Sequence, residues 1–182
     1  MALLAESLVD EWLNRLGFFT VRGIKHGVNE IDLLGVRPDP QGALEAWHVE
    51  VQVSFRPVAY ICPIPTKHSD FAESKKSAKV RPDSIVEDGV EAWVEKKFAS
   101  TEKRKTRNSA WADLDWQFKV VHGVVKFPAE LDFMRRHGIE TIPFHDVLTR
   151  LGSGVSGQIK GGAGTGVSEF LCARRFVELA VG

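Results

Sequence analysis

Hydrophobic and polar residues alternate without a break over nine positions, from Trp47 to Phe55. Strict alternation of this kind is typical of a β-strand that buries one of its faces. We expect the odd-numbered residues of the stretch to pack into a core, and the opposite face to carry the polar residues His48, Glu50, Gln52 and Ser54. Antiparallel sheets often turn a polar face to water, so the alternation alone does not predict a function.

The residues before this strand predict a helix followed by two further strands. Apolar residues recur at helical spacing over residues 3–16, and Gly17 ends the pattern. Residues 18–25 and 29–36 have strand character and are separated by a turn at residues 26–29. Pro38, Pro40 and Gly42 mark a second turn. The short connections predict an antiparallel meander of three strands that packs on the first helix.

The residues after the strand predict alternating helices and strands. Residues 56–82 are rich in proline, and we expect a loop or a short helix there. Residues 83–98 carry an apolar helical stripe, and residues 116–127 form an almost continuous apolar run, as in a strand buried on both faces. A helix leading into such a strand predicts a crossover and a parallel pair. A helix over 128–136, a short strand over 139–143 and a helix over 145–151 complete the pattern.

Glycine then divides the chain. Residues 152–167 are glycine-rich and predict a linker, and residues 168–182 predict a separate C-terminal helix. We therefore expect one domain over residues 1–151. Two glycine patterns of the linker match nucleotide-binding fingerprints by spacing, but neither follows a strand in a βαβ unit, so both are rejected.

Composition agrees with a single domain and shows segregated charge. The chain has 182 residues, 43% of them hydrophobic, which suffices for one full α/β core. Lys plus Arg and Asp plus Glu number 24 each, so the protein lacks the overall basic charge typical of nucleic-acid binders. Basic residues nevertheless gather in two stretches, and the residues we expect to contact phosphates are Lys75, Lys76, Lys79, Lys103, Arg104 and Lys105.

Cysteine content and hydropathy indicate the cellular compartment in which the protein is expected. Cys62 and Cys172 are too few for a disulfide framework or a cysteine-rich zinc site. The N-terminal residues carry Glu6, Asp10 and Glu11 without a basic leader, and no apolar run approaches the ~20 residues of a membrane span. We expect a cytoplasmic protein that does not bind membranes.

Three acidic residues stand among the predicted apolar positions. Asp32 lies within the second strand, Glu50 lies on the polar face of the third, and Glu6 lies at the flank of the first helix's apolar stripe. An unpaired carboxylate buried there would cost several kcal/mol, so we expect these acids at a site mouth, a metal ion or a cationic partner. His48 shares the face of Glu50 and is a candidate base, although a histidine on a strand is more often structural.

This arrangement resembles the PD-(D/E)XK, or restriction-endonuclease-like, nuclease superfamily. The stretch from Gly27 to Leu34, with Asp32 on the second strand, is similar to the first half of the family motif, and Glu50-Val51-Gln52 is similar to the second half. The resemblance implies an α/β fold with an αβββαβ core, in which a mixed central sheet is flanked by helices. It departs from the family pattern at Gln52, because lysine is usual at that position.

The resemblance also implies a chemistry, that of a Mg²⁺-dependent endonuclease that hydrolyses phosphodiester bonds in DNA. Asp32, Glu50 and the main-chain carbonyl of Val51 would bind the Mg²⁺, for which Mn²⁺ could substitute. Gln52 would orient water or phosphate, and Glu6 would support the site. Lys25, Lys67 and Lys75 are candidates for the missing positive charge, and the sequence does not choose among them.

Two other functions remain open at this stage. A nucleic-acid-binding module of the same fold, inactive for want of the lysine, would bind phosphates without a metal. A protein-interaction module would bear these acids only as a solvated sheet face. RNA is not excluded as the substrate, and cleavage of both strands of a duplex would favour a homodimer.

Overall fold

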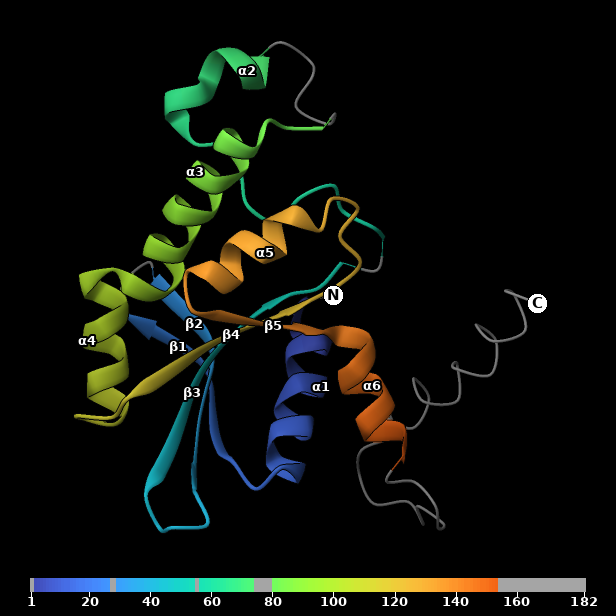
Figure 1. Cartoon of the computed structure of the whole chain (residues 1–182). Coiled ribbons are helices and arrows are strands. Elements are labelled where there is room, and N and C mark those ends of the chain that lie inside the picture. The colour runs from blue at the N-terminus through green and yellow to red at the C-terminus, as the bar shows by residue number, and fades with distance from the viewer. Residues whose placement is uncertain (1, 27–28, 55, 74–79, 154–182) are drawn as a thin grey trace.

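A five-stranded mixed sheet organises the chain (Figure 1). The structure, a computed structural model, describes residues 2–26, 29–54, 56–73 and 80–153. The strands are β1 (Phe19–His26), β2 (Asn29–Pro38), β3 (Leu44–Gln52), β4 (Trp116–His122) and β5 (Ile139–Pro143), and they lie side by side in that order. The first three pair in antiparallel fashion, whereas β4 is parallel to both β3 and β5. The predicted meander and the parallel crossover pair are confirmed.

Helices cover both faces of the sheet (Figure 1). The helices α1 (Ala2–Arg15) and α6 (Phe144–Ser153) pack on one face. The other face is covered by α3 (Asp83–Val94), the π-helix η2 (Glu95–Ala99), α4 (Thr101–Ala110) and α5 (Ala129–Arg136). The loop after β3 contains the 3-10 helix η1 (Thr66–His68) and the short helix α2 (Ser69–Glu73). The protein is thus an α/β fold with a mixed sheet flanked by helices.

The alternation along β3 separates two hydrophobic clusters. Val49 and Val51 pack with α1 and α6, as the pattern predicted. The opposite face is not open to solvent, because η2 and α4 cover it: His48 and Glu50 are both 0% exposed. The polar residues of this strand therefore lie in a closed layer, and each needs a partner within it.

Two predicted elements end earlier than the apolar pattern suggests. The strand expected over 116–127 stops at His122, because the chain at Gly123 turns against Ser54, whose carbonyl oxygen would lie only 2.9 Å from a Cβ at this glycine. The helix expected over residues 83–98 ends at Val94. The chain continues as η2 and then as a separate helix, α4, which begins where the Ser100 hydroxyl accepts a hydrogen bond from the Lys103 N–H.

The predicted linker and C-terminal helix, apart from Gly152 and Ser153 at the end of α6, fall outside the described residues. Among the helices that the structure describes, none combines the length and the apolar character needed to cross a bilayer.

Candidate functional site

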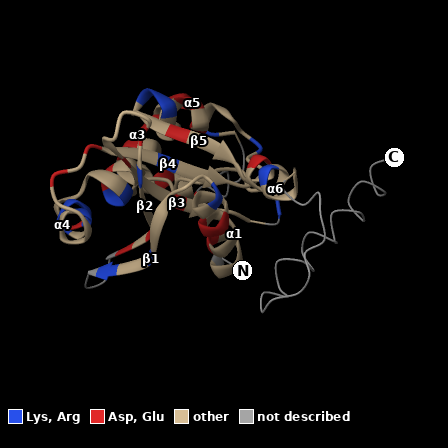
Figure 2. Cartoon of the chain, turned by 90° about the horizontal axis from the view of Figure 1, so that it is seen from below, with Lys and Arg blue, Asp and Glu red and all other residues tan. Residues whose placement is uncertain are grey.

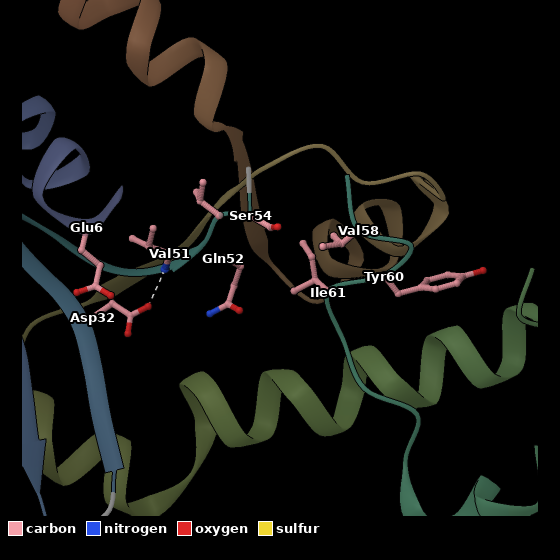
Figure 3. A pocket seen from close by; sticks show the side chains of 9 residues that line it. Glu6, Asp32, Val51, Gln52, Ser54, Val58, Tyr60 and Ile61 are labelled. Carbon is pink, nitrogen blue, oxygen red and sulfur yellow. Dashed lines mark hydrogen bonds between the residues drawn. The ribbon is translucent and has the colours of Figure 1, made fainter. Parts of the chain in front are cut away.

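A pocket of about 360 Å³ lies where β2 begins and β3 ends (Figure 3). Glu6 reaches it from α1, Asp32 from β2 and Gln52 from the last position of β3. The two carboxylates lie next to each other, and the amide of Gln52 lies beside them (Figure 3). The rest of the wall comes from the end of β3 and the following loop, through Val51, Val53, Ser54, Val58, Tyr60 and Ile61. The structure thus brings together Glu6, Asp32, Val51 and Gln52, which the sequence singled out.

Asp32 is held at this pocket where the backbone pairing between β2 and β3 ends. The backbones of β2 and β3 pair as far as Leu33 and Val49. One residue further, the Oδ2 atom of Asp32 accepts a hydrogen bond from the main-chain N–H of Val51, at 2.8 Å. A carboxylate thereby takes the place of a backbone carbonyl, and its second oxygen is free to face the pocket.

The surroundings of Asp32 disfavour its negative charge. Burial, and after it the charge of Glu50, raises the pKa of Asp32 to about 7, although the hydrogen bond from Val51 and the charge of Lys97 act in the opposite direction. Glu6 adds a smaller effect of the same sign as burial. Near neutral pH the carboxyl is therefore only partly ionised, and a cation bound beside it would favour the ionised form.

Glu50 is close to Asp32 but does not line the pocket. Its Oε2 atom lies 2.5 Å from Nζ of Lys97, and its Oε1 atom lies 3.2 Å from Nζ of Lys103 and from Nε2 of His48. Burial opposes ionisation of this carboxyl, but the hydrogen bond from His48 and the charges of the two lysines outweigh it and hold the pKa of Glu50 below its usual value. Glu50 is an ionised acid, buried and fully paired.

His48 is an internal part of this network. Nη1 of Arg107 lies 3.0 Å from Nδ1 of His48, and arginine can only donate, so Nδ1 accepts and Nε2 carries the proton that is donated to Glu50. Burial lowers the pKa of His48 to about 4 against the effect of Glu50. The ring is neutral, packed edge-on against Phe98, and it does not line the pocket, so the structure favours a structural role over that of a base.

The basic stretch of residues 96–107 divides between the interior and the surface. Lys103 was expected to contact phosphates, but its side chain is 3% exposed and points at Glu50, so this expectation is corrected. Arg104 and Lys105 lie on the exposed side of α4. The helical spacing of Lys103, Thr106 and Arg107, all buried, is the sequence signal that could have separated the two sets. Lys75, Lys76 and Lys79 fall outside the described residues.

Lys97 is the site residue that the sequence did not single out. Of the candidates for the missing charge, Lys25 pairs with Glu30 at 3.7 Å and Lys67 pairs with Asp88 at 2.8 Å, and neither lines the pocket. Lys75 is not among the described residues. Lys97, 45 positions after Gln52 in the chain, instead brings an ammonium group to the edge of the acidic cluster.

The oxygen atoms at the pocket suit a hard divalent cation. Within the described ranges, no group of three or more His, Cys, Asp or Glu side chains is arranged to hold a metal. Mg²⁺ nevertheless keeps several waters and needs only one or two carboxylates from a protein. Glu6 and Asp32 supply two, and the charge of a cation would offset the raised pKa of Asp32. Glu50 can become a further ligand only where Lys97 gives up its Oε2 atom.

Comparisons of this chain with protein-family models, with curated proteins and with solved structures found no match.

Proposed function

We propose that the protein is a Mg²⁺-dependent endonuclease that hydrolyses phosphodiester bonds in DNA, with a restriction-endonuclease-like core. The contact between Lys97 and Glu50 carries this proposal. Two acids on adjacent strands, a glutamine and an ammonium group meet at one end of the sheet, although 45 positions separate the ammonium from Gln52 along the chain. The order of helix, antiparallel meander, helix and parallel strand supports the same family.

Each side chain has a defined task in the proposed reaction. Asp32 and Glu6 would hold the metal ion, and the N–H of Val51 fixes the orientation of Asp32. When bound, Mg²⁺ supplies the Lewis acidity that activates water and offsets charge on the phosphoryl group. Gln52 can donate to a phosphate oxygen and accept from the attacking water.

Lys97 would supply the positive charge that Gln52 lacks. Burial works against the ammonium form, but the charge of Glu50 outweighs it and raises the pKa of Lys97 above its usual value. The group therefore carries its proton at Nζ throughout the neutral range. A fixed cation beside the reacting phosphate stabilises the charge that develops in the transition state.

The solvent-facing side of α4 fits the approach of a nucleic-acid backbone. Arg104 and Lys105 are exposed there, and Figure 2 shows basic residues along this helix. Such residues bind phosphates irrespective of base sequence, so they favour neither DNA nor RNA and predict no sequence specificity. If both strands of a duplex are cut, a homodimer would place one site on each strand.

Nucleic-acid binding without cleavage is a second candidate function. Gln52 in place of lysine favours it, as does the engagement of both Glu50 oxygens by other side chains. This candidate predicts binding that weakens steeply with salt and does not require a divalent cation.

Incubation of the full chain with supercoiled, linear and single-stranded DNA, and with RNA, tests the proposal. We expect cleavage with Mg²⁺ or Mn²⁺ and none with chelator. Asp32→Asn should abolish it, and Lys97→Met should reduce it by about 10²–10³-fold, the usual effect of losing one charge-stabilising group. Lys96→Met removes an exposed charge from the same turn and should cleave normally. Cleavage that survives in Asp32→Asn would overturn the assignment. A protein that cuts no substrate with either metal, but still retains nucleic acid in chelator, would favour the binding module.

A further inference from the structure

The two lysines that contact Glu50 are held to different degrees. The Lys103 side chain is 3% exposed, and its Nζ also donates to the main-chain carbonyl of Glu30, so it is tied to two strands at once. The Lys97 side chain is 23% exposed, and the hydrogen bond recorded for its Nζ is the one to Glu50. Lys103 is therefore fixed, whereas Lys97 can leave Glu50 by rotation of its own side chain.

The backbone beneath Lys97 is fixed, which confines any movement to the side chain. Lys97 lies in the π-helix η2, and π-turns are rare and are frequently found at functional sites. The next residue, Phe98, is 0% exposed and contacts the rings of His48, Trp93 and Phe118. This aromatic anchor holds the turn against the sheet while the adjacent lysine reaches the edge of the pocket.

Three cationic groups gather around Glu50, while Asp32 and Glu30 also place negative charge near Lys97. One carboxylate faces the ammonium groups of Lys97 and Lys103 directly, and the guanidinium of Arg107 lies behind His48. A divalent cation beside Asp32 and Glu6 would add two more positive charges next to these groups. The metal ion would repel these cations, and Lys97, the least restrained of them, would move away. The Oε2 atom of Glu50 would then become available to the metal.

We propose that Lys97 is an exchangeable internal counter-ion: it holds Glu50 in the metal-free protein and leaves it when a divalent cation binds beside Asp32. The inference rests on the proposed function for the identity of the cation. Once released from Glu50, the Lys97 ammonium can contact the phosphate of the substrate. Binding of the metal ion and positioning of this ammonium are therefore coupled. Lys103 stays in place in both states.

Calorimetric titration of Mg²⁺ and Mn²⁺ into the full chain, without nucleic acid, tests this exchange. Because the lysine and the metal compete for one carboxylate, Lys97→Met should bind the cation at least about tenfold more tightly than the unmodified protein. Lys96→Met, the matched control on the same turn, should leave the affinity unchanged, and Asp32→Asn should abolish binding. Equal or weaker binding in Lys97→Met would overturn the inference, as would a failure of both proteins to bind.

Carbon-13 NMR of the lysine ε-methylenes gives a second measurement on the unmodified protein, in case the variant does not fold. Addition of Mg²⁺ should shift the Lys97 resonance and leave that of Lys103 nearly unchanged. The opposite pattern, or no shift at either lysine at saturating Mg²⁺, would overturn the exchange. Tighter metal binding by Lys97→Met in a protein that cleaves nothing would support the exchange and refute the nuclease. Cleavage by the unmodified protein with unchanged affinity in Lys97→Met would refute only the exchange.

Discussion

Arg107 donates a hydrogen bond to Nδ1 of His48 over 3.0 Å, and this contact fixes which nitrogen of the histidine carries the proton. The ring can then donate from Nε2 to Glu50, and all three side chains are at most 5% exposed. A chain of directed hydrogen bonds therefore connects α4 to the acid of β3. Its contribution to stability follows from burial, because each member would lose a buried hydrogen-bond partner if its neighbour were removed.

His48→Leu should destabilise the protein by about 2–4 kcal/mol, because it removes the donor to a buried carboxylate and the acceptor of Arg107 together. Urea unfolding at pH 7 would measure the loss. His145→Leu, an exposed histidine on α6, is the control and should change stability by less than about 0.5 kcal/mol. Equal stability of the two variants would show that the network contributes nothing.

Asp32→Asn should stabilise the protein above pH 7 and not below pH 4. The folded pKa of about 7 lies above the ordinary value near 4, so the folded state holds a proton that the unfolded chain has already lost in this range. Stability due to this carboxyl is thus present at low pH and is lost as pH rises from about 4 to about 7. The variant keeps an oxygen for the Val51 N–H and avoids the loss, worth roughly 2–4 kcal/mol.

Thermal unfolding of both proteins at pH 4, 6 and 8 would check this prediction. His48, whose folded pKa is lowered to about 4, reduces stability as pH falls below its ordinary value, but it does so equally in both proteins. The difference between them therefore isolates Asp32. A difference that did not grow with pH would contradict the raised pKa.

Glu130→Ala should destabilise the pocket wall by about 2–4 kcal/mol. The carboxylate of this α5 residue is 0% exposed and accepts hydrogen bonds from the main-chain N–H groups of Ile61, at 2.6 Å, and Cys62, at 2.7 Å. Its loss leaves two buried donors unpaired beside the pocket-lining loop. Asp132→Ala, which removes an exposed acid from the same helix, is the control in urea unfolding. A similar midpoint for both variants would show that the loop holds its shape without Glu130.

Gly123→Ala should cost about 1–3 kcal/mol through overpacking. A Cβ at this position would lie 2.9 Å from the carbonyl oxygen of Ser54, and a backbone atom cannot turn aside as a side chain can. The strain falls next to Gln52, whose carbonyl accepts from the Gly123 N–H at 3.2 Å, so the cleavage proposed above should fall as well. Val124→Ala, at an exposed neighbour, should change neither unfolding nor cleavage. Wild-type stability in Gly123→Ala would show that the chain relaxes without strain.

Local patterns predicted the elements of this fold because each depends on neighbours in the chain. The alternation from Trp47 onward marked β3 and the side of it that packs, and short turns marked the antiparallel order. The ends of elements were less predictable. The early stop of β4 depends on a contact between Gly123 and Ser54, 69 positions apart, which no local pattern records.

The sequence predicted the polar residues of the pocket, but not the partners of Glu50. Asp32, Glu6 and Gln52 are found at one pocket because strand and helix periodicity fix the direction of each side chain. The partners of Glu50 were not predicted, because Lys97 and Lys103 reach it from elements whose docking is a tertiary event. Under the family resemblance, the absence of lysine at position 52 predicted that a charge would come from elsewhere, but not which of the 24 basic residues would supply it.

The π-turn at Glu95–Ala99 makes the site sensitive to chain length as well as to side-chain identity. Trp93 and Phe98 are five positions apart, a spacing that an ordinary helix would place on different sides, yet their rings meet at 5.7 Å and both are buried. Deletion of a single residue from this turn would restore regular helical winding and rotate everything that follows by about 100°. Lys97 would then point away from the sheet, although the residue itself would be unchanged. Deletion of one residue could therefore disable the proposed site without altering any residue that lines the pocket.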